Sequence, residues 1–292
     1  MKVEIQRIGD GPIIRPNMDR RMGSNVNGPS LIKVPDWVSS PLGRYYLYFA
    51  HHDGRYIRLA FADDISGPWQ MHEPGVLPID DSLFQGHIAS PDLHVDHESK
   101  SIRMYFHGAD EPTGQEGVQS TRLALSSDAL NFTERPEILG NPYMRVVRYR
   151  DCYYAMAMPG IFYRSRDGLT GFEVGPKLFD SNMRHAALMV RNDCLLVFYS
   201  QVGDTPERIL LSEIDISVGW WKWRATPPTV VLEPEAHYEG ANCQLEPSVR
   251  GLADRPVRQL RDPAIFNEDG NSYLLYSVAG ESGIGLAKIS IA

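Results

Sequence analysis

The fold is decided by two runs, Tyr45-Tyr46-Leu47-Tyr48-Phe49-Ala50 and Tyr56-Ile57-Arg58-Leu59-Ala60-Phe61, with Asp53-Gly54 between them. Both runs are rich in aromatic and β-branched residues, which favour strands, and Asp-Gly between two such runs marks a hairpin. A shorter run, Ser30–Val34, precedes the pair, and another, Trp69–His72, follows it. The stretch therefore predicts a small sheet of four strands.

The same four-strand unit recurs along the chain. The first strand of each unit is predicted at Ser30–Val34, Asp92–Asp96, Met144–Tyr149, Ala186–Arg191 and Ala264–Asn267. The fourth strand is predicted at Trp69–His72, Phe132–Arg135, Phe172–Val174 and Trp221–Arg224, and the fifth unit lacks one. A repeated sheet of this kind is typical of β-propellers.

The N-terminal run Val3–Ile8 has the composition of a strand but no partner of its own. Placed on the edge of the last sheet, it would close a ring and remove the exposed edges of an open array. We therefore expect an all-β protein, a five-bladed β-propeller whose N-terminal strand closes the last blade, with residues 1–292 forming a single domain. A β-sandwich with irregular loops is the alternative, but it does not require a four-strand repeat.

The composition narrows the classes of partner. The chain has 29 Lys and Arg against 37 Asp and Glu, a net charge of −8, which disfavours nucleic acids and anionic membranes. The first residues lack the apolar core of a secretion signal, and no stretch is apolar for long enough to span a bilayer. Three widely spaced cysteines indicate reduced thiols, so we expect a cytoplasmic protein. The oligomeric state is not indicated.

Propeller geometry converts positions in the sequence into positions in space. The first strand of each blade lines the central channel and the second runs antiparallel to it, so first-strand starts and second-strand ends share one face. The polar residues at those positions are Asn25, Asn27, His51, His52, His87, Ser90, Asp92, His107, Asn141, Arg145, Arg184, His185, Ser200, Gln201, Arg261 and Asp262. Because such groups are costly to gather unless paired, hydrated or used, the sequence predicts a functional site at this channel mouth.

Two segments resemble a known group of enzymes. Arg261-Asp262-Pro263-Ala264-Ile265-Phe266, followed by Tyr273–Ser277, resembles the Arg-Asp-Pro segment of five-bladed propeller glycoside hydrolases. These include the arabinanase/β-xylosidase, invertase-like, anhydrogalactosidase and mannoside-phosphorylase families. Ser90-Pro91-Asp92-Leu93-His94-Val95 is similar to their inner-strand segment in which an acidic residue follows proline. The resemblance implies a propeller that acts on carbohydrate.

The first blade departs from that pattern. These families commonly open it with an Asp-Pro whose carboxylate is the base or nucleophile, whereas Asn25-Val26-Asn27-Gly28-Pro29-Ser30 contains no acid. The role of that carboxylate, if it is kept, must be filled by another residue.

Glycoside cleavage requires a proton donor and a carboxylate that activates water or attacks carbon. Our catalytic candidates are Asp92 and Asp262 at inner-strand starts, Glu246 in the loop entering the last blade, and His185 as an alternative acid. The anhydrogalactosidase resemblance supports His185, since that family uses a histidine as its acid. The candidate substrate-binding residues are Asn27, His52, His87, His107, Arg145, Arg184 and Arg261.

The sequence thus predicts an enzyme, a glycoside hydrolase acting on a small oligosaccharide or an unusual glycosidic linkage. A phosphorylase of the same fold, a non-catalytic carbohydrate-binding propeller, and a lyase or isomerase of uronic acids are the alternatives. The histidines are not spaced as metal ligands on one element, so we expect no metal site and no required cofactor, although the channel axis could hold a structural ion. The expected partner is a small carbohydrate.

Overall fold

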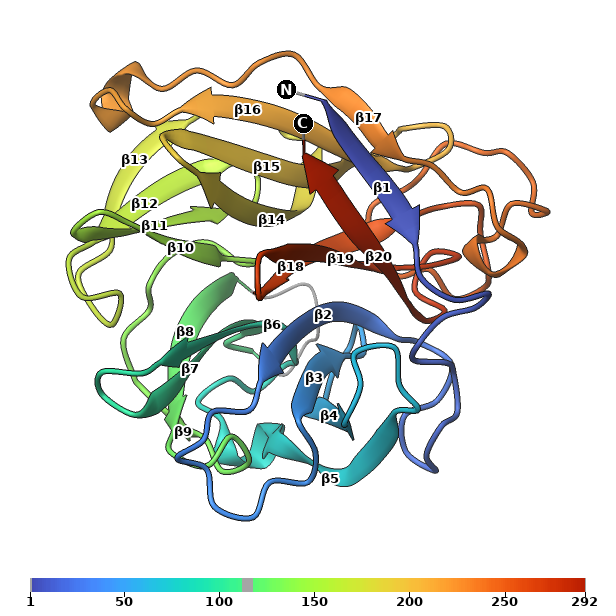
Figure 1. Ribbon diagram of the computed structural model, residues 1–292, viewed down its shortest axis with the longest axis horizontal. Helices are drawn as coiled ribbons and strands as arrows, with labels where there is room; N and C mark the ends of the chain where they lie inside the picture. Colours follow the sequence, from blue (N-terminus) through green and yellow to red (C-terminus); the bar gives the residue numbers. More distant parts are fainter. Residues whose placement is uncertain (1, 112–117, 292) are drawn as a thin grey trace.

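A computed structural model describes residues 2–111 and 118–291. Within these residues, five four-stranded antiparallel sheets surround a central axis (Figure 1). In every sheet the strands follow one another in order from the axis to the rim, except that the last sheet takes its outer strand from the N-terminus. The predicted five-bladed β-propeller is confirmed.

The blades have the following strands. Blade 1 comprises β2 (Asn27–Lys33), β3 (Tyr45–Ala50), β4 (Tyr56–Ala62) and β5 (Gln70–Pro78). Blade 2 comprises β6 (Ile88–Asp96), β7 (Ser101–Ala109), β8 (Gln119–Ser126) and β9 (Thr133–Glu134). Blade 3 comprises β10 (Arg145–Tyr149), β11 (Cys152–Ala157), β12 (Ile161–Ser165) and β13 (Glu173–Lys177). Blade 4 comprises β14 (Met183–Arg191), β15 (Cys194–Gln201), β16 (Ile209–Asp215) and β17 (Thr229–Leu232). Blade 5 comprises β18 (Arg261–Glu268), β19 (Asn271–Ser277), β20 (Ile284–Ile291) and β1 (Val3–Arg7).

The N-terminal strand closes the ring, as predicted. β1 pairs antiparallel with β20, with Val3 opposite Ile291 and Arg7 opposite Ala287. The Arg7 guanidinium donates to the buried Glu239 carboxylate, with Nε 2.8 Å from Oε1. This contact ties β1 to the 3₁₀ turn His237–Glu239, which precedes blade 5 in the chain.

The inner strands begin earlier than predicted. They start at Asn27, Ile88, Met183 and Arg261 instead of Ser30, Asp92, Ala186 and Ala264, and each contains an irregularity that shifts its register against the second strand. Pro29, Pro91 and Pro263 lie in three of these irregularities. Because proline is unusual inside a strand, the sequence predicts that each strand starts after it. The extra residues are β-bulges, which keep the strand continuous while turning one side chain out of the ladder.

The fourth strand of blade 4 is not where the sequence placed it. Trp221–Arg224 is not a strand, because its first part belongs to the 3₁₀ turn Trp220–Lys222, and β17 occupies the edge of this blade instead. Trp223 is buried and packs against Tyr154 and Phe162 of the neighbouring blade, with ring centroids 5.0 and 5.4 Å away. The aromatic run therefore serves packing between blades.

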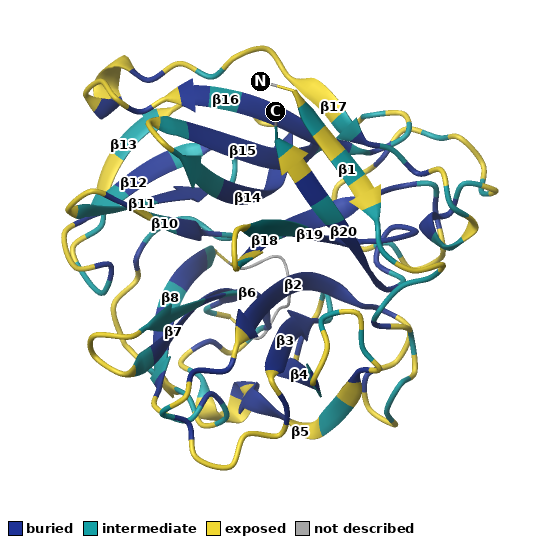
Figure 2. Cartoon of the chain, in the orientation of Figure 1, coloured by how far each residue is buried: buried dark blue, intermediate teal, exposed yellow. Residues whose placement is uncertain are grey.

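The core consists of apolar clusters that join neighbouring blades. One of them joins Tyr46 and Ile57 of blade 1 to Met104 and Phe106 of blade 2. Figure 2 shows the consequence, since the strands are largely buried and exposure is concentrated in loops and outer strands. Among the described residues, no helix has the length and apolar character needed to cross a membrane.

Candidate active site

All five blades present a residue with left-handed backbone at the start of the inner strand. These residues are Gly28, Ser90, Tyr143, His185 and Asp262, with φ values of 60°, 47°, 60°, 41° and 46°. Four of them have a side chain, and this conformation is unfavourable for residues other than glycine. Such residues concentrate at functional sites, where the surrounding structure holds them in place. The left-handed residues therefore lie at the channel mouth where the sequence predicts a functional site.

A small pocket of about 170 Å³ opens at this mouth. The residues that line it are His52, His87, Gln119, Tyr143, Met158, Arg184, His185, Arg250 and Gly251. They come from inner-strand starts, from the ends of second strands (His52, Met158), from the start of the third strand β8 (Gln119) and from the loop between β17 and β18 (Arg250, Gly251). Three of the five histidines expected at this face line the pocket, and His107 lies directly behind Tyr143, with ring centroids 3.9 Å apart.

His185 and Asp262 form an imidazole–carboxylate pair across two blades. Nδ1 of His185 lies 2.8 Å from Oδ1 of Asp262, a close electrostatic contact rather than an aligned hydrogen bond. Ser277 donates to the other oxygen of Asp262 at 2.9 Å. Both members of the pair are buried, so the carboxylate fixes the ring and leaves Nε2 as the nitrogen available to a ligand.

The protonation of this pair follows from its surroundings. Burial alone would raise the pKa of Asp262, but the His185 ring, the Ser277 hydroxyl and the Arg184 charge hold that pKa below its ordinary value. Burial lowers the pKa of His185, and the Asp262 carboxylate opposes this only in part. At neutral pH the carboxylate is therefore ionised and the ring is neutral, so Nε2 can accept a proton.

Tyr143 stacks between two histidines. Its ring centroid lies 3.9 Å from that of His107 and 4.7 Å from that of His185. Burial lowers the pKa of His107 well below its ordinary value, and the nearby His87 and His185 rings add to the effect. Neither ring nitrogen of His107 has a hydrogen-bond partner among the described residues. Tyr143 thus packs against one face of the His185 ring.

Two buried glutamates, which sequence reasoning missed, hold the arginines of the mouth. Glu207 accepts from Nε of Arg184 at 3.0 Å and from Nε of Arg261 at 3.1 Å. Glu281 accepts from Nη1 of Arg261 at 3.0 Å. Both glutamates precede a third strand, and third-strand starts lie on the same face as second-strand ends. Searching those positions would have identified them.

The arginines expected to bind substrate are occupied by the protein. Arg184 donates to Glu207 and to the Val249 carbonyl. Arg145 bridges three inner-strand carbonyls, those of Ser90, Pro91 and Ala186. Among the other candidates for substrate binding, His52 and His87 line the pocket.

Asn27 also serves the protein. Its side-chain nitrogen lies 3.2 Å from Oε2 of Glu281 and 3.2 Å from Oδ1 of Asn25. Asn27 thus contacts Glu281 and Asn25 beside the mouth and does not line the pocket.

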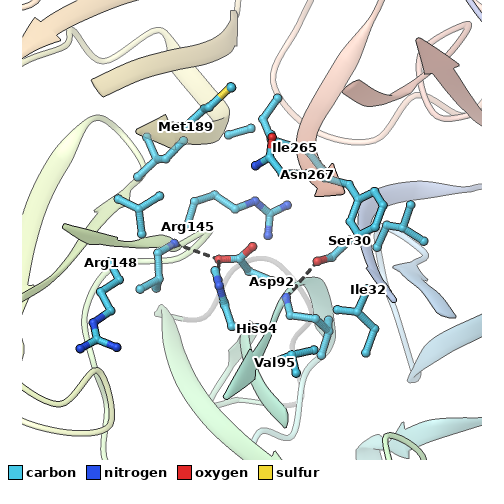
Figure 3. A pocket seen from close by; sticks show the side chains of 18 of the residues that line it. Ser30, Ile32, Asp92, His94, Val95, Arg145, Arg148, Met189, Ile265 and Asn267 are labelled. Atoms are coloured by element: carbon cyan, nitrogen blue, oxygen red, sulfur yellow. Dashed lines mark hydrogen bonds and ion pairs between the residues drawn. The ribbon is translucent and has the colours of Figure 1, made fainter. Parts of the chain in front are cut away.

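Asp92 is not brought to the same mouth as His185. It lies two residues beyond the left-handed Ser90 and lines a separate cavity of about 590 Å³ toward the other end of the inner strands (Figure 3). Oδ2 of Asp92 lies 2.9 Å from Nε2 of His94 and accepts from the Val146 backbone N–H at 2.9 Å. The carboxylate thus satisfies a backbone group on the channel-facing edge of the next blade. The expectation that Asp92 and Asp262 share one site is incorrect.

Glu246 does not reach over the channel. Its carboxylate pairs with Arg255 at 2.8 Å within the loop between β17 and β18, and it does not line the pocket. The later part of the same loop does approach the mouth, where Val249 and Gly251 accept hydrogen bonds from Arg184 and Arg261. The loop that the sequence singled out thus contacts the arginines of the mouth through Val249 and Gly251 and not through Glu246.

Titratable side chains gather at this mouth. Among the described residues, no group of three or more histidine, cysteine, aspartate or glutamate side chains is placed to hold a metal ion. Imidazoles that lie beside carboxylates, as His185 lies beside Asp262, can in general accept or donate protons.

Comparison with solved structures concerns the fold. The five-bladed β-propeller is similar to those of glycoside hydrolases of the GH43 group. The GH43_1 enzyme of Xanthomonas citri, complexed with xylose, matches with a TM-score of 0.63 and 13% identity over 96% of this chain and 91% of that one. A β-xylosidase/α-arabinofuranosidase from a compost metagenome, complexed with xylotriose, matches with a TM-score of 0.61 and 14% identity over 98% and 94%. An α-L-arabinofuranosidase of Lactobacillus brevis matches with 0.57 and 12% identity over 91% of each chain.

The comparison of sequences identifies a narrower family than the comparison of folds. The chain is 35% identical to the uncharacterized protein R118 of Acanthamoeba polyphaga mimivirus, across 91% of this chain and 83% of that protein. It belongs to the family of that mimivirus protein. A scan against models of protein families matches none of them.

Proposed function

We propose that the chain is a glycoside hydrolase that cleaves a small oligosaccharide or an unusual glycosidic linkage in the mouth pocket. The observation that carries the proposal is the His185–Asp262 pair, with Nδ1 2.8 Å from Oδ1, on two residues held in left-handed backbone at the mouth. The fold supports it, because solved structures of similar fold are glycoside hydrolases complexed with sugars. Fold alone would not be sufficient.

In the proposed reaction His185 acts as the general base. The lowered pKa of its ring favours the neutral form, which suits a base better than the acid role expected from the sequence. Nε2 takes a proton from water while the water oxygen bonds to the anomeric carbon and the bond from that carbon to the leaving oxygen breaks. Asp262 stays ionised, holds the ring and stabilises the imidazolium that forms.

The size of the pocket restricts the substrate. A volume of about 170 Å³ is small for a ligand pocket, which suits one sugar ring better than a polymer. We therefore propose a small glycoside whose terminal ring enters the pocket.

We propose a cytoplasmic location for the enzyme, which would receive such small glycosides after import. The three free cysteines are consistent with a reducing compartment. The proposal includes no cofactor.

Phosphorolysis is the less favoured reaction. It would require guanidinium groups that can hold phosphate, and the three arginines expected to do so already contact carboxylates or backbone carbonyls. Water is the smaller acceptor and needs only a base. Turnover with and without inorganic phosphate distinguishes the two reactions.

The test is a turnover screen of aryl glycosides and short oligosaccharides with the purified chain and two variants. His185→Gln and Asp262→Asn are expected to lower kcat/KM by about 10²- to 10⁴-fold, the usual contribution of a general base. His72→Gln, on the outer strand β5, is the matched control and should match wild type. Sugar binding without turnover by the wild type, or full activity in both variants, would refute the proposal.

A further inference from the structure

A second imidazole–carboxylate pair lies at the same mouth. His52 follows β3 at the first turn of blade 1, and its Nδ1 lies 3.3 Å from Oε1 of Glu281. The ring lines the same pocket as His185 and is about nine-tenths buried. The pair therefore approaches the pocket from blades 1 and 5, whereas His185 enters it from blade 4.

Glu281 is held by donors from three segments. Asn25 donates to its Oε2 at 2.6 Å, and Asn27 lies 3.2 Å from the same atom. Arg261 donates to its Oε1 at 3.0 Å. Asn25 also accepts from the His52 backbone N–H at 2.8 Å, so it fixes the main chain of the histidine as well. These hydrogen bonds hold both the Glu281 carboxylate and the main chain of His52 in place.

We propose that His52, oriented by Glu281, is the general acid that protonates the leaving oxygen while His185 takes a proton from water. The inference rests on the proposed glycoside hydrolysis and supplies the proton donor that it left unassigned. Glu281 is a positioning residue, since it acts through the His52 ring.

The step balances without a further reactant. The bond between the anomeric carbon and the leaving oxygen breaks, and that oxygen receives the proton of His52. The water oxygen bonds to the anomeric carbon and gives its proton to Nε2 of His185. The two rings then return to their starting states by exchanging a proton with solvent.

The charges around His52 suit a proton donor. Burial raises the pKa of Glu281, but the contact with His52 and the Arg261 charge hold it below its ordinary value, so the carboxylate is ionised. This carboxylate lies 3.3 Å from Nδ1 of His52 and would stabilise the positive charge of a protonated ring. Other charged or titratable groups near this pair include Asp262, Arg261, His107, His51 and Tyr143.

The test uses the dependence of rate on the leaving group. A general acid matters greatly for a poor leaving group such as methanol or a sugar, and little for 2,4-dinitrophenolate, which leaves without a proton. His52→Gln is expected to lower kcat/KM for a methyl or oligosaccharide substrate by about 10²-fold or more, and for the dinitrophenyl glycoside by less than about fivefold. His185→Gln should lower both rates, because its role does not depend on the leaving group.

The matched control is His51→Gln, one residue away. Nδ1 of His51 accepts from the Asp53 backbone N–H in the turn, and His51 does not line the pocket. This variant should keep the wild-type ratio of the two rates. Glu281→Gln should shift the ratio in the same direction as His52→Gln, and a thermal melt checks its fold because Glu281 also pairs with buried Arg261.

The outcomes separate the two proposals. If wild type cleaves no glycoside, the proposed function fails. If wild type cleaves both substrates and His52→Gln lowers both rates equally, or neither, the role of His52 is refuted while hydrolysis stands. Recovery of the poor-leaving-group rate when imidazole is added to His52→Ala would support proton donation and would not follow from a structural role.

Discussion

At the scale of single residues, the mouth differs from the resemblance by exchanging carboxylates for histidines. The first-blade stretch that would carry Asp-Pro has Gly28-Pro29 instead. A Cβ on Gly28 would lie 3.0 Å from the Cα and Oγ of Ser90, so the neighbouring blade occupies the space of a side chain. A side chain at residue 28 would therefore be crowded by Ser90, whereas the imidazoles of His52 and His185 line the pocket at the same mouth.

This packing predicts the cost of a side chain at residue 28. Gly28→Ala combines a left-handed φ of 60° with the contact to Ser90, and we expect it to lower the free energy of unfolding by about 1–3 kcal/mol. Gly219→Ala is the control, since φ is −59° and a Cβ there would meet nothing within 4 Å. Urea unfolding of both variants measures the difference, and equal stability would contradict the packing argument.

The titration of His185 predicts the acid side of the pH profile. A base works only when unprotonated, so kcat/KM falls as pH drops through the pKa of the ring. Burial lowers that pKa below 6.5, with Asp262 opposing and Arg184 reinforcing the shift. We expect the acid limb of the profile to have its midpoint below pH 6.5. A midpoint clearly above 6.5, or the same limb in His185→Gln, would assign it to another group.

At the scale of elements, the four-strand repeat could be predicted from the sequence, but the starts of the inner strands could not. Aromatic runs such as Tyr45–Ala50 identify strands because their composition suits a pleated, buried surface. The bulges at Ser90 and Asp262 depend on contacts between blades, which no local pattern records. Glu207 and Glu281 could have been found at the starts of third strands, but their pairing with Arg261, 54 and 20 residues away, could not be predicted from the sequence.

The tryptophans of blade 4 give a prediction at this scale. Trp223 is buried against Tyr154 and Phe162, whereas 61% of the surface of Trp221 is exposed. We expect Trp223→Ala to lower the free energy of unfolding by about 3–5 kcal/mol, because it leaves a cavity between blades. Trp221→Ala should change it by about 0.5 kcal/mol or less. Thermal and urea melts compare the two, and a larger effect at Trp221 would be inconsistent with the packing described.

At the scale of the molecule, closure of the ring brings the mouth together. His52 comes from the first blade, His185 from the fourth and Asp262 from the fifth, so their meeting depends on the shape of the whole ring (Figure 1). β1 completes blade 5 by pairing with β20, and Arg7 links that strand to Glu239. Stability of the closure therefore supports the geometry of the site.

Arg7→Ala tests the closure. It leaves the carboxylate of Glu239 buried without its cation, and because Arg7 is partly exposed we expect a loss of about 1–3 kcal/mol in unfolding free energy. Lys2→Ala is the control, since the Lys2–Glu4 pair on the same strand is solvent-exposed. A Tm lowered only by Arg7→Ala would support the account. A Tm unchanged in both variants would show that this link does not hold the ring.

The most direct measurement is a crystal structure of the Asp262→Asn variant soaked with the glycoside that wild type cleaves. We expect one sugar ring in the mouth pocket, with its anomeric carbon facing Nε2 of His185 and its leaving oxygen facing His52. A sugar bound only in the cavity beside Asp92, with the mouth holding solvent, would contradict it.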